Sequence, residues 1–171
     1  TNDDVVYFDA AHCYSQMAIY TFDLGNANPD IRVNITLPGA GVTPFGIVTR
    51  YHDSKNYWLW LVTPGTAGND FSLIEMNNGV PTIRASADID WVVGQTYALK
   101  LTHTGNDYAG YVDGVFKLAY TDGTGFLNDH TLMGLMEAGA SNGQFDLLQA
   151  FFLYGLGDVT SGNFTYSSSV D

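Results

Sequence analysis

The sequence predicts an all-β protein, an antiparallel two-sheet sandwich, on three observations. Its 171 residues are 46% hydrophobic and 14% aromatic, which is enough apolar surface for a domain with its own core. Aromatic and β-branched side chains fit a pleated sheet, whereas the helix formers Glu and Lys number only 2 and 3. Short apolar runs also alternate with Gly, Asn and Asp turns at intervals of about 8 to 12 residues, which favours hairpins over a parallel sheet with helical crossovers.

The clearest predicted strand covers residues 31–37, where every second side chain is apolar. A hairpin follows, formed by residues 45–51 and 57–62 around the turn at 52–56. Further short strands are expected at 5–8, 17–22, 71–76, 82–87, 95–103, 108–112, 115–120, 132–137 and 145–153. Alternate residues of a strand point to the same face, so the apolar residues at alternate positions are expected to form one core. This core is expected to contain Ile31, Val33, Ile35, Leu37, Ile47, Leu59, Leu61, Leu73, Leu99, Leu101, Val112 and Leu135.

The domain organisation follows from where this alternation stops. Residues 1–154 are expected to form a single β-sandwich domain, without an internal repeat. Residues 155–171 are rich in Gly, Ser, Thr and Asn and show no sustained period, so we expect an extended C-terminal arm or linker there.

The charge and hydropathy of the chain limit the classes of partner that it is expected to bind. Eighteen acidic residues against six basic ones give a formal net charge of −12, which disfavours binding to nucleic acid or to anionic lipid. No apolar run is long enough to span a bilayer, so no membrane insertion is expected. Cys13 is the only cysteine, which excludes an intrachain disulfide.

The order of the hairpins resembles the concanavalin A-like, laminin-G-like jelly-roll superfamily of lectins and glucanases. The stretches that carry this resemblance are Phe45 to Tyr51 with the return at Asn56-Tyr57, Val80 to Ala85, Gly94 to Leu101, Tyr111 to Val115, and Met133-Gly-Leu135 with Phe145-Asp146. The resemblance implies a jelly-roll sandwich whose concave sheet often binds glycans, and sometimes cleaves them or mediates assembly. It also implies a structural Ca²⁺ ion held in part by Asp146, for which a plain surface role is the alternative.

Catalysis is not expected, because glycoside hydrolysis needs two carboxyl groups across the scissile bond. The Glu-x-Asp-x-x-Glu motif of the glucanases that the chain resembles is absent, and Glu75 and Glu137 each stand alone. The pair Asp88 and Asp90 lies at a strand end, where turn and solubility roles are commoner. The four histidines, at 12, 52, 103 and 130, show no zinc-ligand spacing.

The most suggestive ligand surface is the segment Tyr57 to Leu61. Alternation places Trp58 and Trp60 on one face of this strand, where they are expected to stack on a sugar ring, with Arg50 within reach of the same face. The alternative is a strand buried on both sides, with Arg50 paired to an Asp.

The leading functional hypothesis is a non-catalytic carbohydrate-binding or adhesion module, located outside the cell, on a virion such as a phage tail or on a secreted bacterial protein. A structural domain for virion assembly or capsid decoration is the alternative, with other protein chains as partners and a homo-oligomer as one form of it. A polysaccharide-cleaving enzyme is the least favoured reading.

Overall fold

The computed structural model describes residues 6–7, 17–37, 44–65, 70–138 and 144–152, and all the regular elements in these ranges are strands. Each predicted strand is present to within two residues at either end, which confirms the all-β prediction. In chain order the strands are β1 (Val6–Tyr7), β2 (Met17–Asp23), β3 (Pro29–Thr36), β4 (Phe45–Asp53), β5 (Asn56–Val62), β6 (Phe71–Asn77), β7 (Val80–Ala87), β8 (Thr96–Thr104), β9 (Asp107–Val112), β10 (Val115–Thr121), β11 (Leu132–Ala138) and β12 (Gln144–Phe152).

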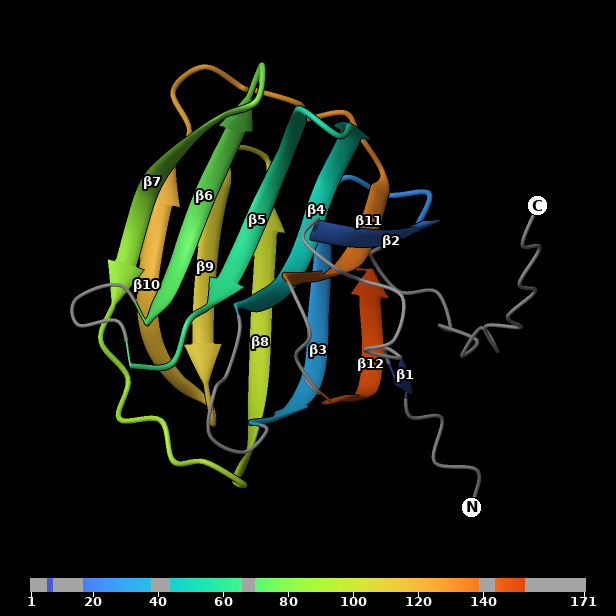
Figure 1. Ribbon diagram of the computed structural model, residues 1–171. Coiled ribbons are helices and arrows are strands. Elements are labelled where there is room, and N and C mark those ends of the chain that lie inside the picture. The colour runs from blue at the N-terminus through green and yellow to red at the C-terminus, as the bar shows by residue number, and fades with distance from the viewer. Residues whose placement is uncertain (1–5, 8–16, 38–43, 66–69, 139–143, 153–171) are drawn as a thin grey trace.

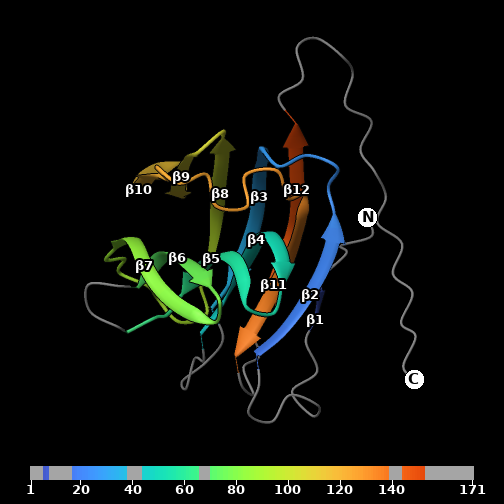
Figure 2. The ribbon, with the colours of Figure 1, turned by 90° about the horizontal axis from the view of Figure 1, so that it is seen from above.

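The strands form two six-stranded antiparallel sheets that pack face to face (Figures 1 and 2). Sheet A has the order β1-β12-β3-β8-β9-β10, and sheet B has the order β2-β11-β4-β5-β6-β7. Each sheet contains a meander of hairpins, β8 to β10 in sheet A and β4 to β7 in sheet B. The predicted two-sheet sandwich is therefore confirmed, and the described residues contain no helix that could cross a membrane.

Two of the hairpins turn on dipeptides that adopt positive φ at both positions. Asn78 and Gly79 have φ of 51° and 78°, and Asp113 and Gly114 have φ of 50° and 76°. This is the type I′ geometry, in which the backbone twist of a two-residue loop matches the twist of the flanking strands. These turns therefore set the register of β6 against β7 and of β9 against β10.

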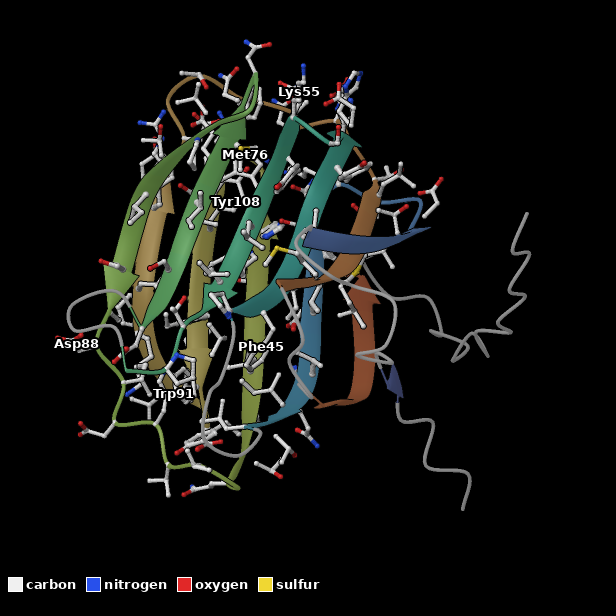
Figure 3. All side chains as sticks on the ribbon, in the orientation of Figure 1. Phe45, Lys55, Met76, Asp88, Trp91 and Tyr108 are labelled. Carbon is white, nitrogen blue, oxygen red and sulfur yellow. The ribbon has the colours of Figure 1, made fainter. Side chains whose placement is uncertain are left out.

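The main core lies between the sheets and is lined by the side chains that point inward from both of them. Tyr108, on β9 of sheet A and labelled in Figure 3, belongs to this core. Ten of the twelve residues expected in the core are in this cluster, namely Ile31, Val33, Ile35, Leu37, Ile47, Leu73, Leu99, Leu101, Val112 and Leu135.

Leu59 and Leu61 are the exceptions, and their placement in this core was wrong. They point to the outer face of sheet B, where they belong to a second apolar cluster with Val48, Tyr57, Ile74, Met76 and Met136. Strand β5 is thus buried on both faces, as the alternative interpretation of its sequence required. The predicted C-terminal arm, residues 155–171, and Cys13 lie outside the described residues.

Candidate functional site

Trp58 and Trp60 are core residues, and the expectation that they form an exposed platform for sugar is wrong. Their exposed fractions are 0% and 1%, so neither ring has a face open to a ligand. The inward face of β5 carries these large rings because the opposite sheet leaves space for them. A Cβ atom at Gly110, on β9, would lie 2.7 Å from the Trp60 ring.

Both indole nitrogens are satisfied inside the molecule. Trp58 Nε1 donates to the carbonyl oxygen of Phe126 at 3.0 Å, and its ring lies 4.6 Å from that of Tyr108. Trp60 Nε1 donates to Nε2 of His103 at 3.2 Å. Because buried donors are costly to leave unpaired, these bonds fix the orientation of the two tryptophans within the core.

Arg50 does share a face with the tryptophans, as expected, but it too is buried, with 2% exposure. The residue has a φ of 50°, at an irregularity where β4 loses its regular pairing with β5, and this turns its side chain inward. Its guanidinium donates to Tyr108 Oη at 2.6 Å, to Asn28 Oδ1 at 3.2 Å and to the carbonyl oxygens of Ala27 and Gly105. No carboxylate within the described residues forms an ion pair with Arg50, so the alternative of an Asp partner is also wrong.

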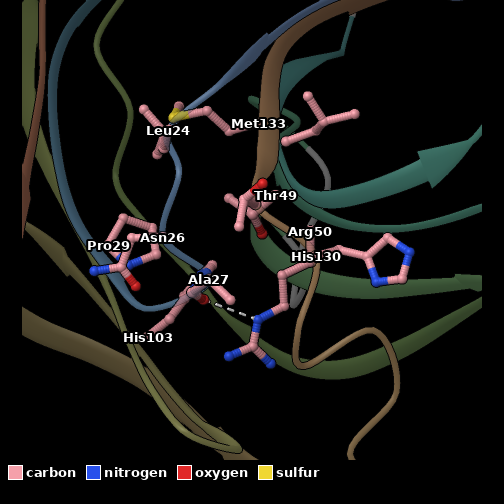
Figure 4. A pocket seen from close by; sticks show the side chains of 11 residues that line it. Leu24, Asn26, Ala27, Pro29, Thr49, Arg50, His103, His130 and Met133 are labelled. Carbon is pink, nitrogen blue, oxygen red and sulfur yellow. Dashed lines mark hydrogen bonds between the residues drawn. The ribbon is translucent and has the colours of Figure 1, made fainter.

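A small depression opens beside Arg50, at the end of the sandwich where the 24–29 segment meets β4 (Figure 4). Thr49 Oγ1 and His103 Nδ1 lie buried at its wall and have no hydrogen-bond partner among the described residues. Burial, and then the nearby charge of Arg50, lower the pKa of His103 to about 3. The depression has no room for a water-sized group, so this cluster is part of the packed interior and does not form a ligand site.

The outer face of sheet A presents a different surface, a cross-strand row made of Phe116, Tyr111, Lys100 and Arg32. These four residues, on β10, β9, β8 and β3, are direct Cα partners from one strand to the next. Phe116 is 56% exposed, and its ring meets that of Tyr111 edge to face at 5.7 Å. Lys100 Nζ lies 5.5 Å from the centre of the Tyr111 ring, a cation–π contact.

Asp30 anchors the charged end of this cross-strand row. Its carboxylate accepts from Arg32 Nε and lies near Lys100 Nζ, both at 3.3 Å, while its own side chain is only 13% exposed. The cationic side chains keep 52% and 39% exposure, respectively. A ring to stack on, cationic donors and a carboxylate acceptor therefore lie on one open sheet face, which is the combination that recognises hydroxyl-rich ligands.

Sequence reasoning missed this cross-strand row, although one signal for it was present. The dipeptide Asp113-Gly114 predicts a two-residue turn, and such a turn places Val112 opposite Val115 and Tyr111 opposite Phe116. The extension to Lys100 and Arg32 depends on the pairing of β9 with β8 and of β8 with β3, which no local pattern specifies.

The expected calcium ligand, Asp146, lies on β12, where its Cα partner is Asn34 on β3. The side chain of Asp146 is outside the described part of the chain. Among the residues that are described, no three His, Cys, Asp or Glu side chains gather in a way that could hold a metal ion. Calcium binding by Asp146 therefore stays a prediction.

The remaining candidates for chemistry are engaged in structural contacts. Glu75 is 5% exposed and bonds Arg84 at 2.8 Å, so the structure uses it as half of an ion pair across β6 and β7. His52 and His130 each bond the Asp that is adjacent in sequence, at 2.9 Å. Asp88 and Trp91 lie at the end of the sandwich opposite Lys55 (Figure 3).

Comparison with known proteins supports the fold at the level of structure. No family profile matches the sequence, and no curated protein sequence matches it significantly. The carbohydrate-binding module CBM66 from Bacillus subtilis superposes with a TM-score of 0.61 at 15% identity, over 85% of this chain and 89% of that one. The Caenorhabditis elegans galectin LEC-6 gives 0.60 at 9% identity over 87% and 96%, and congerin II, with lactose and MES bound, gives 0.56 at 12% over 80% and 100%.

Proposed function

We propose that the chain is a non-catalytic carbohydrate-binding module, and that its ligand binds on the outer face of sheet A. The chain folds as a jelly-roll sandwich of the concanavalin A-like type, and the solved structures that it resembles include a carbohydrate-binding module and galectins. The fold is shared with sugar-binding proteins at low sequence identity, and a shared fold does not locate a site, so we assign the site from this chain's own surface.

Phe116 is the observation that carries this proposal. Of the phenylalanine, tyrosine and tryptophan side chains whose placement the structure describes, Phe116 is the only one more than half exposed. An exposed ring costs solvation free energy unless it meets a partner, and a sugar presents an apolar C–H face that packs on such a ring. The neighbouring Tyr111 holds the ring from its edge and so limits its motion.

The charge of the site indicates a neutral, hydroxyl-rich ligand. Asp30 offsets part of the positive charge of Lys100 and Arg32, and the chain as a whole carries a net charge of −12. A polyanion such as heparin or DNA would be repelled at long range, and its binding is not expected. Sugar hydroxyl groups, in contrast, both donate and accept hydrogen bonds, which suits ammonium, guanidinium and carboxylate groups side by side.

A module that binds without cleaving is favoured by the state of the carboxyl groups. Glu75, the one glutamate with a described side chain, is paired with Arg84, and Asp30 is paired with two cations. Both carboxyl groups are thus engaged by cations, whereas an acid and base pair would need two carboxyl groups across the scissile bond. Location outside the cell, on a virion or on a secreted bacterial protein, fits such a module and remains part of the proposal, as does structural Ca²⁺.

Assembly is the second candidate function, because apolar side chains are exposed away from the cross-strand row. Val80 and Ile83 lie on β7, an edge strand of sheet B, and are 62% and 52% exposed. Edge strands with exposed apolar groups can pair with other chains, which would give a homo-oligomer or a docked assembly. Pro81, between them, lacks an N–H to donate and so opposes continuous strand pairing.

The test is a glycan array probed with the isolated protein and with Phe116→Ala, each in calcium and in chelator. Ile83→Ala is the matched control, because Ile83 is about as exposed as Phe116 but lies on the other sheet. The proposal predicts that wild type and Ile83→Ala bind the same neutral glycans and that Phe116→Ala loses them. A wild-type protein that binds no glycan, or a Phe116→Ala protein that binds as wild type does, overturns it. Molecular mass measured on the same samples reports any assembly.

A further inference from the structure

The cross-strand row runs perpendicular to the strands, and its length sets the size of ligand that can contact all of it. Phe116, Tyr111, Lys100 and Arg32 are consecutive Cα partners across β10, β9, β8 and β3. Adjacent strands are separated by about 4.8 Å, so three spacings place the two ends of the cross-strand row roughly 14 Å apart. That distance is greater than one sugar ring can bridge.

No described side chain closes either end of this surface. Beyond Phe116 the sheet ends at the edge strand β10, and along the cross-strand row every side chain is at least partly exposed. A site that captures the terminal sugar of a chain needs a wall against which that end stops, and typically buries most of the ligand. Among the described side chains of β3, β8, β9 and β10, the outer face of sheet A shows no such wall.

The polar and apolar groups are also divided along the cross-strand row. The aromatic half, Phe116 and Tyr111, provides a stacking surface, and the charged half, Lys100 and Arg32 with Asp30, provides hydrogen-bond donors and an acceptor. One sugar residue can use only one of these halves at a time. The full set of contacts is available only to a ligand that extends from one half to the other.

We infer that the module binds an internal stretch of a neutral polysaccharide chain, about three sugar units laid across β10 to β3, at roughly one unit per strand spacing. This inference rests on the proposed function and adds the class of ligand: an extended chain contacted along its length, not a terminal sugar. Phe116 anchors one unit by stacking, and Arg32 and Lys100 hold hydroxyl groups of units further along.

The test measures affinity by calorimetry against ladders of one to six sugar units prepared from β-1,4-glucan, β-1,4-mannan, β-1,4-galactan and β-2,6-fructan, together with the parent polysaccharides. For the sugar that binds, affinity is expected to rise at least tenfold from one unit to three and then to level off. Reduction of the sugar at the reducing end to its alditol should leave the affinity of the longest oligomer unchanged within twofold, because the protein does not need that end for binding.

Two variants at opposite ends of the cross-strand row test how many sugar units are needed to reach each end. Phe116→Ala should weaken binding at least tenfold at every length, whereas Arg32→Ala should weaken binding of three or more units and leave two units unchanged within twofold. Ile83→Ala is the control, and unfolding midpoints show that the variants are folded. Equal affinity for one unit and six, or loss of binding on modifying the chain end, overturns the inference while leaving the proposed function intact. Failure of every ladder and every polysaccharide to bind overturns the proposed function itself.

Discussion

Arg50 and Tyr108 join the two sheets from within. Nη1 of Arg50, on β4 of sheet B, donates to Tyr108 Oη, on β9 of sheet A, at 2.6 Å, and the guanidinium carbon lies 5.0 Å from the centre of the same ring. The remaining donors of Arg50 bond the 27–28 segment and the turn after β8. One cationic side chain thus ties together two sheets and two loops, without a carboxylate partner among the described residues.

Replacing Arg50 is therefore expected to destabilise the fold strongly. Arg50→Ala leaves the acceptors of Tyr108, Asn28 and Gly105 without their donor, and hydrogen bonds to a charged group each contribute about 1.5 to 3 kcal/mol. We expect a loss of roughly 3 to 5 kcal/mol in the free energy of unfolding, measured by urea titration. Arg32→Ala, at an exposed arginine, is the control and should change this free energy by less than about 1 kcal/mol. If Arg50→Ala also lost less than about 1 kcal/mol, the hydrogen bonds of Arg50 would not be what holds the two sheets together.

The buried tryptophans predict a change in stability. Trp58→Ala removes a ring that fills the core between Tyr108, Tyr120 and Phe126 and should cost about 3 to 5 kcal/mol of unfolding free energy. Trp58→Phe, which keeps an aromatic ring but not the bond to the Phe126 carbonyl oxygen, should cost less. Urea midpoints measure both, and a Trp58→Ala protein of unchanged midpoint but impaired glycan binding would restore the platform hypothesis.

The close contact at Gly110 predicts a cost from the addition of a single methyl group. In Gly110→Ala the new Cβ would lie 2.7 Å from the Trp60 ring and 2.9 Å from Phe71, so both rings must shift. Overpacking of this kind costs about 1 to 3 kcal/mol. Gly123→Ala is the matched control, because nothing lies within 4 Å of its added Cβ. Equal unfolding midpoints for the two variants would contradict the packing described for Trp60.

His103 predicts a specific dependence of stability on pH. Its pKa is lowered to about 3 in the folded protein, below the ordinary 6.5, because of burial and then the charge of Arg50. As pH falls from 6.5 toward 3, the unfolded chain therefore takes up a proton that the folded protein refuses. The contribution of His103 to the free energy of unfolding is therefore complete above pH 6.5. It declines below that pH, by on the order of 2 kcal/mol between pH 6.5 and 5.

Nuclear magnetic resonance tests this state of His103 directly. The imidazole should show no titration between pH 5 and 8, and its ¹⁵N shifts should report a proton on Nδ1, since Nε2 accepts from Trp60. A His103 ring that titrates near pH 6.5 would show that it is solvated.

The strands and turns follow from local sequence, whereas the packing of the strands depends on residues that are far apart in the chain. Alternation and turn dipeptides predicted the strands, because strand side chains alternate with period two and a turn such as Asn78-Gly79 requires positive φ wherever it occurs. The inward face of β5 was predicted wrongly because both of its faces are apolar. What decides the face is space in the other sheet: Gly110, fifty residues further along the chain, leaves room for Trp60.

The candidate site illustrates the same limit. Tyr111 and Phe116 could be placed opposite each other from the turn at Asp113-Gly114, but Lys100 and Arg32 join them through the register of strands far apart in sequence. Arg50 was placed correctly on the face of the tryptophans, yet its burial depends on acceptors from three other segments. Long-range register and packing therefore determine which surfaces remain open for function.

The most direct test of the central claim is to map, by two-dimensional ¹H–¹⁵N and side-chain ¹H–¹³C spectra, where a bound oligosaccharide perturbs the protein. The probe is the longest oligomer that binds by calorimetry. The account predicts shifts concentrated at Phe116, Tyr111, Lys100 and Arg32 on the outer face of sheet A, with the residues around Tyr57 and Met76 on the outer face of sheet B unchanged. Shifts confined to sheet B or to the loops, with the cross-strand row unperturbed at saturation, would contradict it.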